Sequence, residues 1–198
     1  EETEKRLDEL REIGFTKALA HTLGHAFLLK KHGFSVFGGF RMNVLNGLSA
    51  RVCENYGFED ITLSFEGTVP KLSEISCGIP RGIVAYGRLP LMIMRRCPIA
   101  DGAACGKKSP FGEGKSCGGA IFDRLGNKIP VHCGGNSVEL LNPDVLVMSD
   151  KRDMLGKFDF CVLKFTDETD ISPIFEMYKN GKKPSGKLTR GLYYRGAI

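Results

Sequence analysis

The sequence predicts an α/β protein, a partial TIM-like (βα) barrel that comprises the C-terminal half, with a Cys-rich loop and a β-hairpin insertion. Four glycines carry this prediction: Gly14, Gly33, Gly57 and Gly78 each follow a helix-like stretch and precede an apolar run. Glycine often ends a helix in the left-handed conformation, so each marks a helix followed by a strand. Repeated βα units imply a parallel sheet. A complete barrel needs about 250 residues, and we count only about five units.

Residues 1–96 hold the first units. The opening helix, 2–13, has acidic residues in its first turn and Leu7 and Leu10 on one stripe, which favours a helix that packs on the core. The fourth helix has Thr68 as its N-cap and Pro70 in its first turn. The helices after the first are expected at 24–32, 46–56 and 69–76, and the strands at 17–21, 35–40, 60–64 and 82–86.

The second half of the chain has a different composition and a different pattern of predicted elements. Residues 97–150 are expected to form a long Gly- and Lys-rich loop over 100–119 and then a hairpin with strands at 120–123 and 128–132. Residues 151–198 are expected to form a final βα unit, with a strand at 158–165 and a helix at 171–180, and a basic tail. The three segments form one domain. Because the chain starts at Glu1, we expect a fragment of a longer protein.

Composition excludes several classes. The chain has 28 Lys+Arg against 23 Asp+Glu, a formal net charge of +5, and 42% hydrophobic residues, which excludes a disordered chain. No apolar run approaches the ~20 residues of a membrane span, and the acidic start is unlike a signal peptide. The chain is therefore expected to be cytoplasmic, with no membrane partner. Its charge permits RNA as a partner without requiring it.

Polar residues follow the predicted strands. His21, Arg41 and Glu66 lie at or just after the ends of the first three predicted strands, and they are the catalytic candidates. Asn43 and Arg88 are the substrate-binding candidates. The carboxyl ends of parallel strands carry the reactive face of such folds. There, Arg41 would hold a carboxylate or phosphate, and His21 or Glu66 would move a proton. The alternative is that these strand ends simply meet solvent.

Four cysteines form the strongest local signal. Cys97, Cys105, Cys117 and Cys133 are spaced C-x7-C-x11-C-x15-C. Structural zinc usually uses closely spaced pairs, whereas widely spaced single cysteines suit an iron–sulfur cluster. A 4Fe-4S cluster is the first expectation; zinc, or no metal and four unrelated thiols, are the alternatives. His132 ranks behind the thiolates as a ligand. The remaining thiols, of Cys53, Cys77 and Cys161, are expected in the core.

Several motifs occur together in order, and on them the chain resembles peptidase family U32, the collagenase-like peptidases. They are Tyr86-Gly-Arg-Leu-Pro-Leu-Met-Ile-Met-Arg-Arg-Cys97-Pro98 with the later cysteines, Phe40-Arg-Met-Asn43, Thr62-Leu-Ser64-Phe-Glu66, Glu139-Leu-Leu-Asn142, Ser149-Asp150 and Thr189-Arg-Gly-Leu-Tyr-Tyr-Arg-Gly196. The resemblance implies the C-terminal half of a TIM-like barrel. It also implies a 4Fe-4S cluster on the four cysteines named above.

The resemblance leaves the reaction open. It implies either an iron–sulfur enzyme that hydroxylates RNA or a small aromatic substrate, or a peptidase that hydrolyses peptide bonds. A third hypothesis is a non-catalytic half that binds RNA through the basic tail, 179–195, with Tyr193 and Tyr194 between its cations. The expected partners are the missing N-terminal barrel half, RNA, and a second copy of the chain. The isolated half is expected to be inactive.

Overall fold

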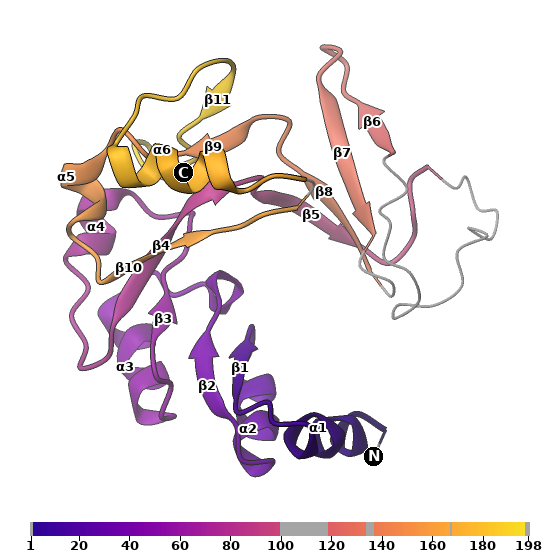
Figure 1. The fold of residues 1–198 in the computed structure, drawn as a ribbon, viewed down its shortest axis with the longest axis vertical. Helices are drawn as coiled ribbons and strands as arrows, with labels where there is room; N and C mark the ends of the chain where they lie inside the picture. The colour runs from indigo at the N-terminus through magenta and orange to yellow at the C-terminus, as the bar shows by residue number, and fades with distance from the viewer. Residues whose placement is uncertain (1, 100–118, 134–136, 167, 197–198) are drawn as a thin grey trace.

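The first part of the chain alternates helices and strands. A computed structural model describes residues 2–99, 119–133, 137–166 and 168–196 (Figure 1). The order of its first elements is α1 (Glu2–Glu12), β1 (Lys17–Ala20), α2 (Leu23–Lys31), β2 (Ser35–Gly38), the short 3-10 helix η1 (Phe40–Met42), α3 (Gly47–Asn55), β3 (Ile61–Thr62), α4 (Val69–Ser73) and β4 (Arg81–Gly87). The predicted elements of this half are confirmed, although β3 and α4 are shorter than expected.

Three of the four glycines act as predicted. Gly14, Gly33 and Gly57 have φ values of 99°, 77° and 72°, the left-handed conformation that ends a helix. Gly78 differs, because its N–H donates to Glu54 Oε2 at 3.0 Å and so ties the start of β4 to the end of α3. A tertiary contact rather than a helix C-cap therefore explains this glycine.

The main sheet is parallel over most of its width. β1, β2, β3 and β4 are neighbours in chain order, and β10 (Phe160–Leu163) lies parallel to β4. At the end of β4 the sheet changes: β9 (Val145–Val147) pairs antiparallel with Tyr86 and Gly87, and β11 (Leu188–Thr189) extends it. The prediction of a parallel sheet is confirmed, and the antiparallel strand β9 was not foreseen.

A second, antiparallel sheet follows β4. Its order is β5 (Pro90–Met94), β8 (Val138–Leu141), β7 (Lys128–Cys133) and β6 (Ala120–Phe122). The predicted hairpin is confirmed as β6 and β7, and Asp123 closes its turn by accepting hydrogen bonds from the N–H groups of Leu125 and Asn127 at 2.8 and 2.9 Å. The sequence analysis assigned no strand to β5 or β8, which pair with each other across the hairpin.

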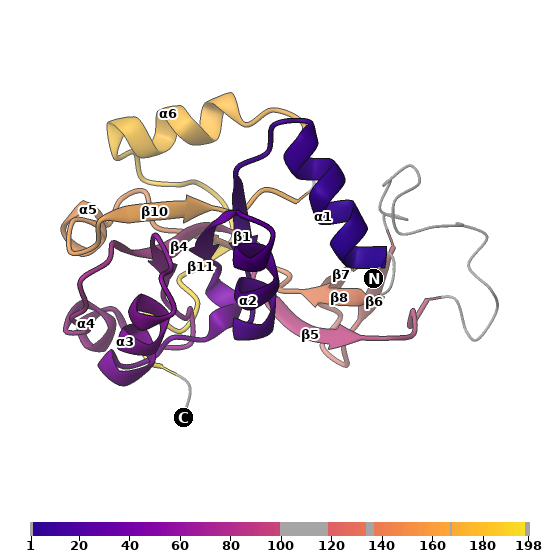
Figure 2. The same ribbon diagram turned by 90° about the horizontal axis from the view of Figure 1, so that it is seen from below.

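The C-terminal elements close over the main sheet. α5 (Arg152–Leu155) precedes β10 and α6 (Ser172–Asn180) follows it, and Figure 2 shows α6 on the side of the sheet away from α2 and α3. Tyr193 is 1% exposed, and its hydroxyl donates to the Val84 carbonyl at 2.6 Å. Within the described residues, no helix is long and apolar enough to cross a membrane.

Candidate functional site at the strand carboxyl ends

His21 is held in a tight space directly after β1. A Cβ placed on Gly39 would lie 2.3 Å from the ring atoms Nδ1 and Cε1 of His21, so only glycine leaves room for the imidazole. The ring is partly buried, and no described residue forms a hydrogen bond to its Nδ1. Burial, followed by the charges of Arg41 and His25, lowers the pKa of His21. The neutral imidazole is therefore favoured, with a ring nitrogen free to accept a proton.

The lowered pKa of His21 should make the free energy of unfolding depend on pH. Because the pKa of His21 is lower in the folded chain than its ordinary value of about 6.5, the unfolded chain binds the proton more tightly. The free energy of unfolding should therefore fall as the pH drops below neutral. We expect His21→Asn to lose this part of the dependence, measured as the difference between urea unfolding at pH values about one unit above and below the ordinary pKa. An equal pH dependence in both proteins would contradict the expectation.

Three aromatic rings follow the three neighbouring strands β1, β2 and β3. The His21 and Phe40 ring centroids are 5.7 Å apart in an edge arrangement, and those of Phe40 and Phe65 are also 5.7 Å apart. The Arg41 guanidinium carbon lies 5.8 Å from the centre of the Phe40 ring. The sequence analysis missed both phenylalanines as members of the site. Their position directly after a strand was the available signal.

Arg41 is already engaged by a carboxylate. Its guanidinium forms an ion pair with Glu139 on β8, where the Glu139 side chain is 12% exposed. This pair joins the strand ends of the main sheet to the second sheet. An anionic ligand that binds Arg41 must therefore share the guanidinium with Glu139 or displace it. Glu139 was quoted only as part of a motif at the sequence level, because its partner lies in another sheet.

Asn43 positions the loop that carries Glu66. Asn43 has φ 53°, and its Oδ1 accepts a hydrogen bond from the Ser64 hydroxyl at 2.5 Å. The same hydroxyl accepts a hydrogen bond from the Glu66 N–H at 3.2 Å. Asn43 and Ser64 therefore tie the segment after β2 to the loop after β3, and His21, Arg41, Asn43 and Glu66 all follow carboxyl ends of parallel strands. Their predicted roles stay predictions.

Arg88 has a different set of contacts. Its Nη1 donates to the carbonyls of Asn142, at 3.0 Å, and Pro143, so the guanidinium binds the turn between β8 and β9. Lys164 Nζ donates to the Arg88 carbonyl at 3.3 Å. These contacts join β4, β10 and the β8–β9 turn. Its predicted role in substrate binding stays a prediction.

Two of the four predicted metal ligands lie on one small core. Val131, Val138 and Leu140 form the buried centre of the second sheet, and Cys97 and Cys133 both pack against it. Cys133 pairs with Val138 across β7 and β8, and Met94, three residues before Cys97, pairs with Val138 from the other side. Both thiols are free and partly buried. Cys105 and Cys117 lie outside the described residues, and the described residues contain no group of three or more potential metal ligands.

The second sheet separates these thiols from the polar strand ends. Side chains alternate between the faces of a strand, so Val138 and Glu139 lie on opposite faces of β8. Cys133 shares the face of Val138, and His132 shares that of Glu139, with which it pairs. Glu139 is the residue that contacts Arg41. His132 is therefore on the face away from Cys133.

The other thiols are in different environments. Cys53 is 2% exposed and Cys77 is partly buried against the main core, as expected. Cys161 is free and exposed on β10, so the expectation that it belongs to the core is wrong. Among the described strands β10 pairs with β4 alone, and a strand at an edge leaves more of its side chains open to solvent.

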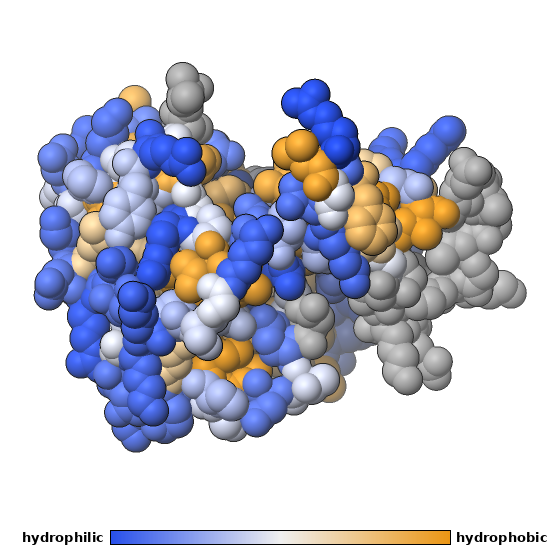
Figure 3. Space-filling view, turned by 90° about the horizontal axis from the view of Figure 1, so that it is seen from above, coloured by the Kyte–Doolittle hydropathy of each residue, from blue (hydrophilic) through white to orange (hydrophobic). Residues whose placement is uncertain are grey.

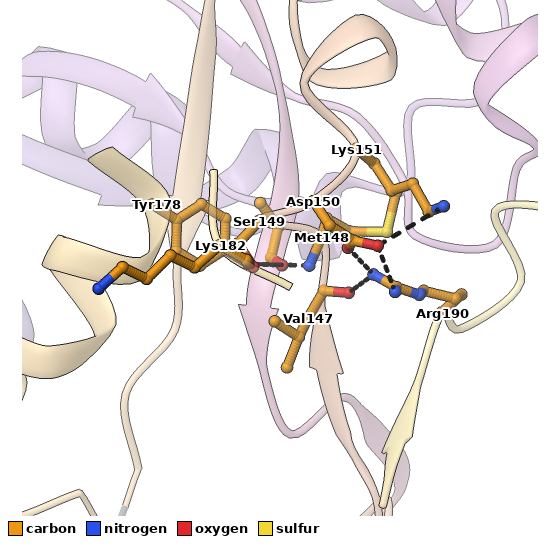
Figure 4. A network of polar contacts seen from close by, with 9 residues as sticks. Val147, Met148, Ser149, Asp150, Lys151, Tyr178, Lys182 and Arg190 are labelled. Carbon is orange, nitrogen blue, oxygen red and sulfur yellow. Dashed lines mark hydrogen bonds and ion pairs between the residues drawn. The ribbon is translucent and has the colours of Figure 1, made fainter. Parts of the chain in front are cut away.

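A network of polar contacts ties the C-terminal elements to the main sheet (Figure 4). Arg190 binds Asp150 through two nitrogens, at 2.6 and 2.9 Å. Burial, the largest single influence on Asp150, opposes its ionisation. The hydrogen bonds from Arg190 and its own backbone, together with the charges of Arg190 and Lys151, outweigh burial and lower its pKa. Tyr178 accepts a hydrogen bond from the Met148 N–H at 2.9 Å and donates to the Ala85 carbonyl at 2.5 Å. These groups satisfy one another, so the network positions α6 and β11.

A polar cavity of about 500 Å³ lies at the other end of the main sheet, before β4. Residues 73–81 and Asp159 line it. Arg81 contacts two other residues that line the cavity. Its guanidinium donates to the Ile75 carbonyl, and its backbone N–H donates to Asp159 Oδ2 at 2.8 Å. In parallel α/β folds this end is generally structural. The cavity therefore does not belong to the candidate site.

Comparisons of this chain with protein-family models, with curated proteins and with solved structures found no match.

Proposed function

We propose that this chain binds a 4Fe-4S cluster through Cys97, Cys105, Cys117 and Cys133. The supporting observation is that Cys97 and Cys133, far apart in the sequence, pack against the same small core as free thiols. Cluster irons take single thiolates from separate pieces of backbone, which suits this arrangement. The cluster would supply redox chemistry that side chains lack.

The reaction we propose is hydroxylation of RNA or of a small aromatic substrate, as the family resemblance implies. The polar strand ends suit such a role. His21 favours its neutral form and would accept a proton, and Arg41 would bind an anionic group in competition with Glu139. Peptide-bond hydrolysis is the alternative. It would need a metal with an open position, and sites rich in thiolate are more often structural.

We also propose that the parallel strands are the C-terminal half of a (βα) barrel. Chain-order neighbours β1 to β4, followed by β10, support this arrangement. β1 ends the described sheet, and Ile13, Phe15 and Leu19, in and just before it, are 72%, 55% and 57% exposed. A further strand, from an N-terminal half or from a second copy, would cover these side chains.

Metal analysis tests the proposed function. The full chain is purified without oxygen, and its visible spectrum and its iron, sulfide and zinc contents are measured. We expect broad visible absorbance, with iron and sulfide in equal amounts. Stoichiometric zinc with no sulfide would contradict the cluster and favour a structural thiolate site. A colourless protein without metal, after iron and sulfide have been supplied, would contradict both.

A further inference from the structure

A cluster of cations gathers where α5 meets the C-terminal end of α6. Arg152 donates to the Lys179 carbonyl, and the Ser149 hydroxyl donates to the Lys182 carbonyl at 2.8 Å. Arg152 also lies directly over Gly181, where a Cβ would come within 2.4 Å of its Nε. These contacts join two segments that are distant in the sequence. We call the cations of these two segments the basic face: Lys151, Arg152 and Lys157 in and next to α5, and Lys179, Lys182 and Lys183 at and just after the end of α6.

Part of this charge is uncompensated. Lys151 lies 3.6 Å from Asp150, and Lys179 lies 3.8 Å from Glu176. Lys157, Lys182 and Lys183 are exposed, and no described acidic residue forms an ion pair with any of them. Seen from above, hydrophilic side chains cover the left of the molecule, where Figure 1 places α5 and the end of α6 (Figure 3). Such a surface attracts a polyanion.

An exposed aromatic ring lies one helical turn from the basic face. Phe175 is 51% exposed and precedes Lys179 by four residues on α6, so both side chains lie on one side of the helix. Its ring packs on Phe165, with centroids 5.9 Å apart, and Phe165 packs in turn on Tyr86 at 5.7 Å. The ring of Phe175 is thus supported from beneath while half of its surface faces solvent.

We propose that α6 and the basic face bind single-stranded nucleic acid. Cations that neutralise phosphates beside an aromatic ring that stacks on a base are the combination that single strands require. Phe165 follows the carboxyl end of β10, so the surface runs from the strand carboxyl ends along α6 to the basic face. Tyr193 and Tyr194, the tyrosines of the tail, do not take part. The Val69 N–H donates to the Tyr193 carbonyl at 3.0 Å, which places this segment beside α4. The proposal does not depend on the cluster.

Binding of a short, fluorescently labelled single-stranded RNA of mixed sequence tests the proposal, measured by anisotropy over a range of salt concentrations. One variant replaces Lys157, Lys182 and Lys183 by Gln. The matched control replaces Lys5, Lys71 and Lys128, exposed lysines on other elements, and changes the net charge equally. We expect the first variant to bind at least about tenfold more weakly, with a salt slope smaller by about 2, because each phosphate contact contributes about 0.7. The control should bind like the parent chain.

Phe175→Leu separates stacking from charge. It keeps an apolar side chain against Phe165, and we expect roughly tenfold weaker binding with an unchanged salt slope, because one base loses the aromatic ring on which it stacks while no charge is removed. Equal losses in the two lysine variants would overturn the proposal. So would tighter binding to duplex RNA than to the single strand, or a parent chain that binds anionic phosphatidylserine vesicles but not RNA.

Discussion

Replacing Cys97 or Cys133 by Ser should remove the iron and the visible absorbance of the chain purified without oxygen. A cluster held by four thiolates loses one of its iron ligands in each variant, and a serine hydroxyl is a poor substitute at neutral pH. The two substitutions should act alike, because both thiols pack on the core formed by Val131, Val138 and Leu140. Iron content and the visible spectrum are the measurements.

Cys161→Ser is the matched control. It removes a free thiol that is exposed on β10, in the other sheet, and it should leave the iron content unchanged. Full iron content in Cys97→Ser or Cys133→Ser would show that the altered thiol is not a ligand. Loss of iron in all three variants would mean that removing any cysteine lowers the iron content, and it would not identify Cys97 or Cys133 as a ligand.

Gly87→Ala should destabilise the chain severely. Gly87 has φ 117°, which side-chain-bearing residues rarely adopt, and an added Cβ would lie 2.0 Å from the backbone carbonyl oxygen of Lys164. The position joins three strands, because Gly87 ends β4, pairs with Leu146 of β9 and faces the end of β10. The atoms nearest the added Cβ are the carbonyl group and Cβ of Lys164, not the far end of a flexible side chain that could give way. We expect a loss of about 3 kcal/mol or more in the free energy of unfolding.

Gly14→Ala separates backbone strain from the clash. Gly14 has φ 99°, but no atom lies within 4 Å of an added Cβ. Only the left-handed backbone conformation then disfavours alanine, and we expect the free energy of unfolding to fall by about 1–2 kcal/mol. Denaturant unfolding of both variants gives the comparison. Equal losses would mean that the contact with Lys164 relaxes freely and that the three-strand junction is not rigid.

Local signals predicted the elements whose cause lies within a few residues. The N-cap predicted for α4, Thr68, forms no side-chain capping hydrogen bond. Helices α2 and α3 are capped instead by Thr22 and Asn46, which the sequence analysis did not name as caps and which accept hydrogen bonds from the N–H groups of His25, at 3.1 Å, and Ser49, at 2.9 Å. Gly33 and Gly57 end these helices. The hairpin of β6 and β7 was predicted from the two runs that flank Leu125-Gly126-Asn127, and in the structure Asp123 and Gly126 form its turn. In each case the stabilising contacts are short in sequence.

The sequence did not predict the pairings between strands that are far apart in the chain. Strands β5 and β8 are stabilised by each other across the hairpin, and β9 pairs with the last two residues of β4. These pairings join residues far apart in the chain, so no local pattern specifies which strand pairs with which. For the same reason the sequence did not show that Glu139 binds Arg41, or that Arg88 is engaged by the turn after β8.

The sequence by itself determined the alternation of helices and strands, the parallel main sheet, and the polar residues that follow its strands. Periodicity, caps and glycines act over one or two helical turns, so they can be interpreted without the fold. Only the tertiary structure decided which side chains meet: Cys97 with Cys133 on one core, Arg41 with Glu139 between two sheets, and Arg152 with Gly181 at the basic face. These contacts depend on the register and crossing of elements that are far apart in the chain, which no local pattern records.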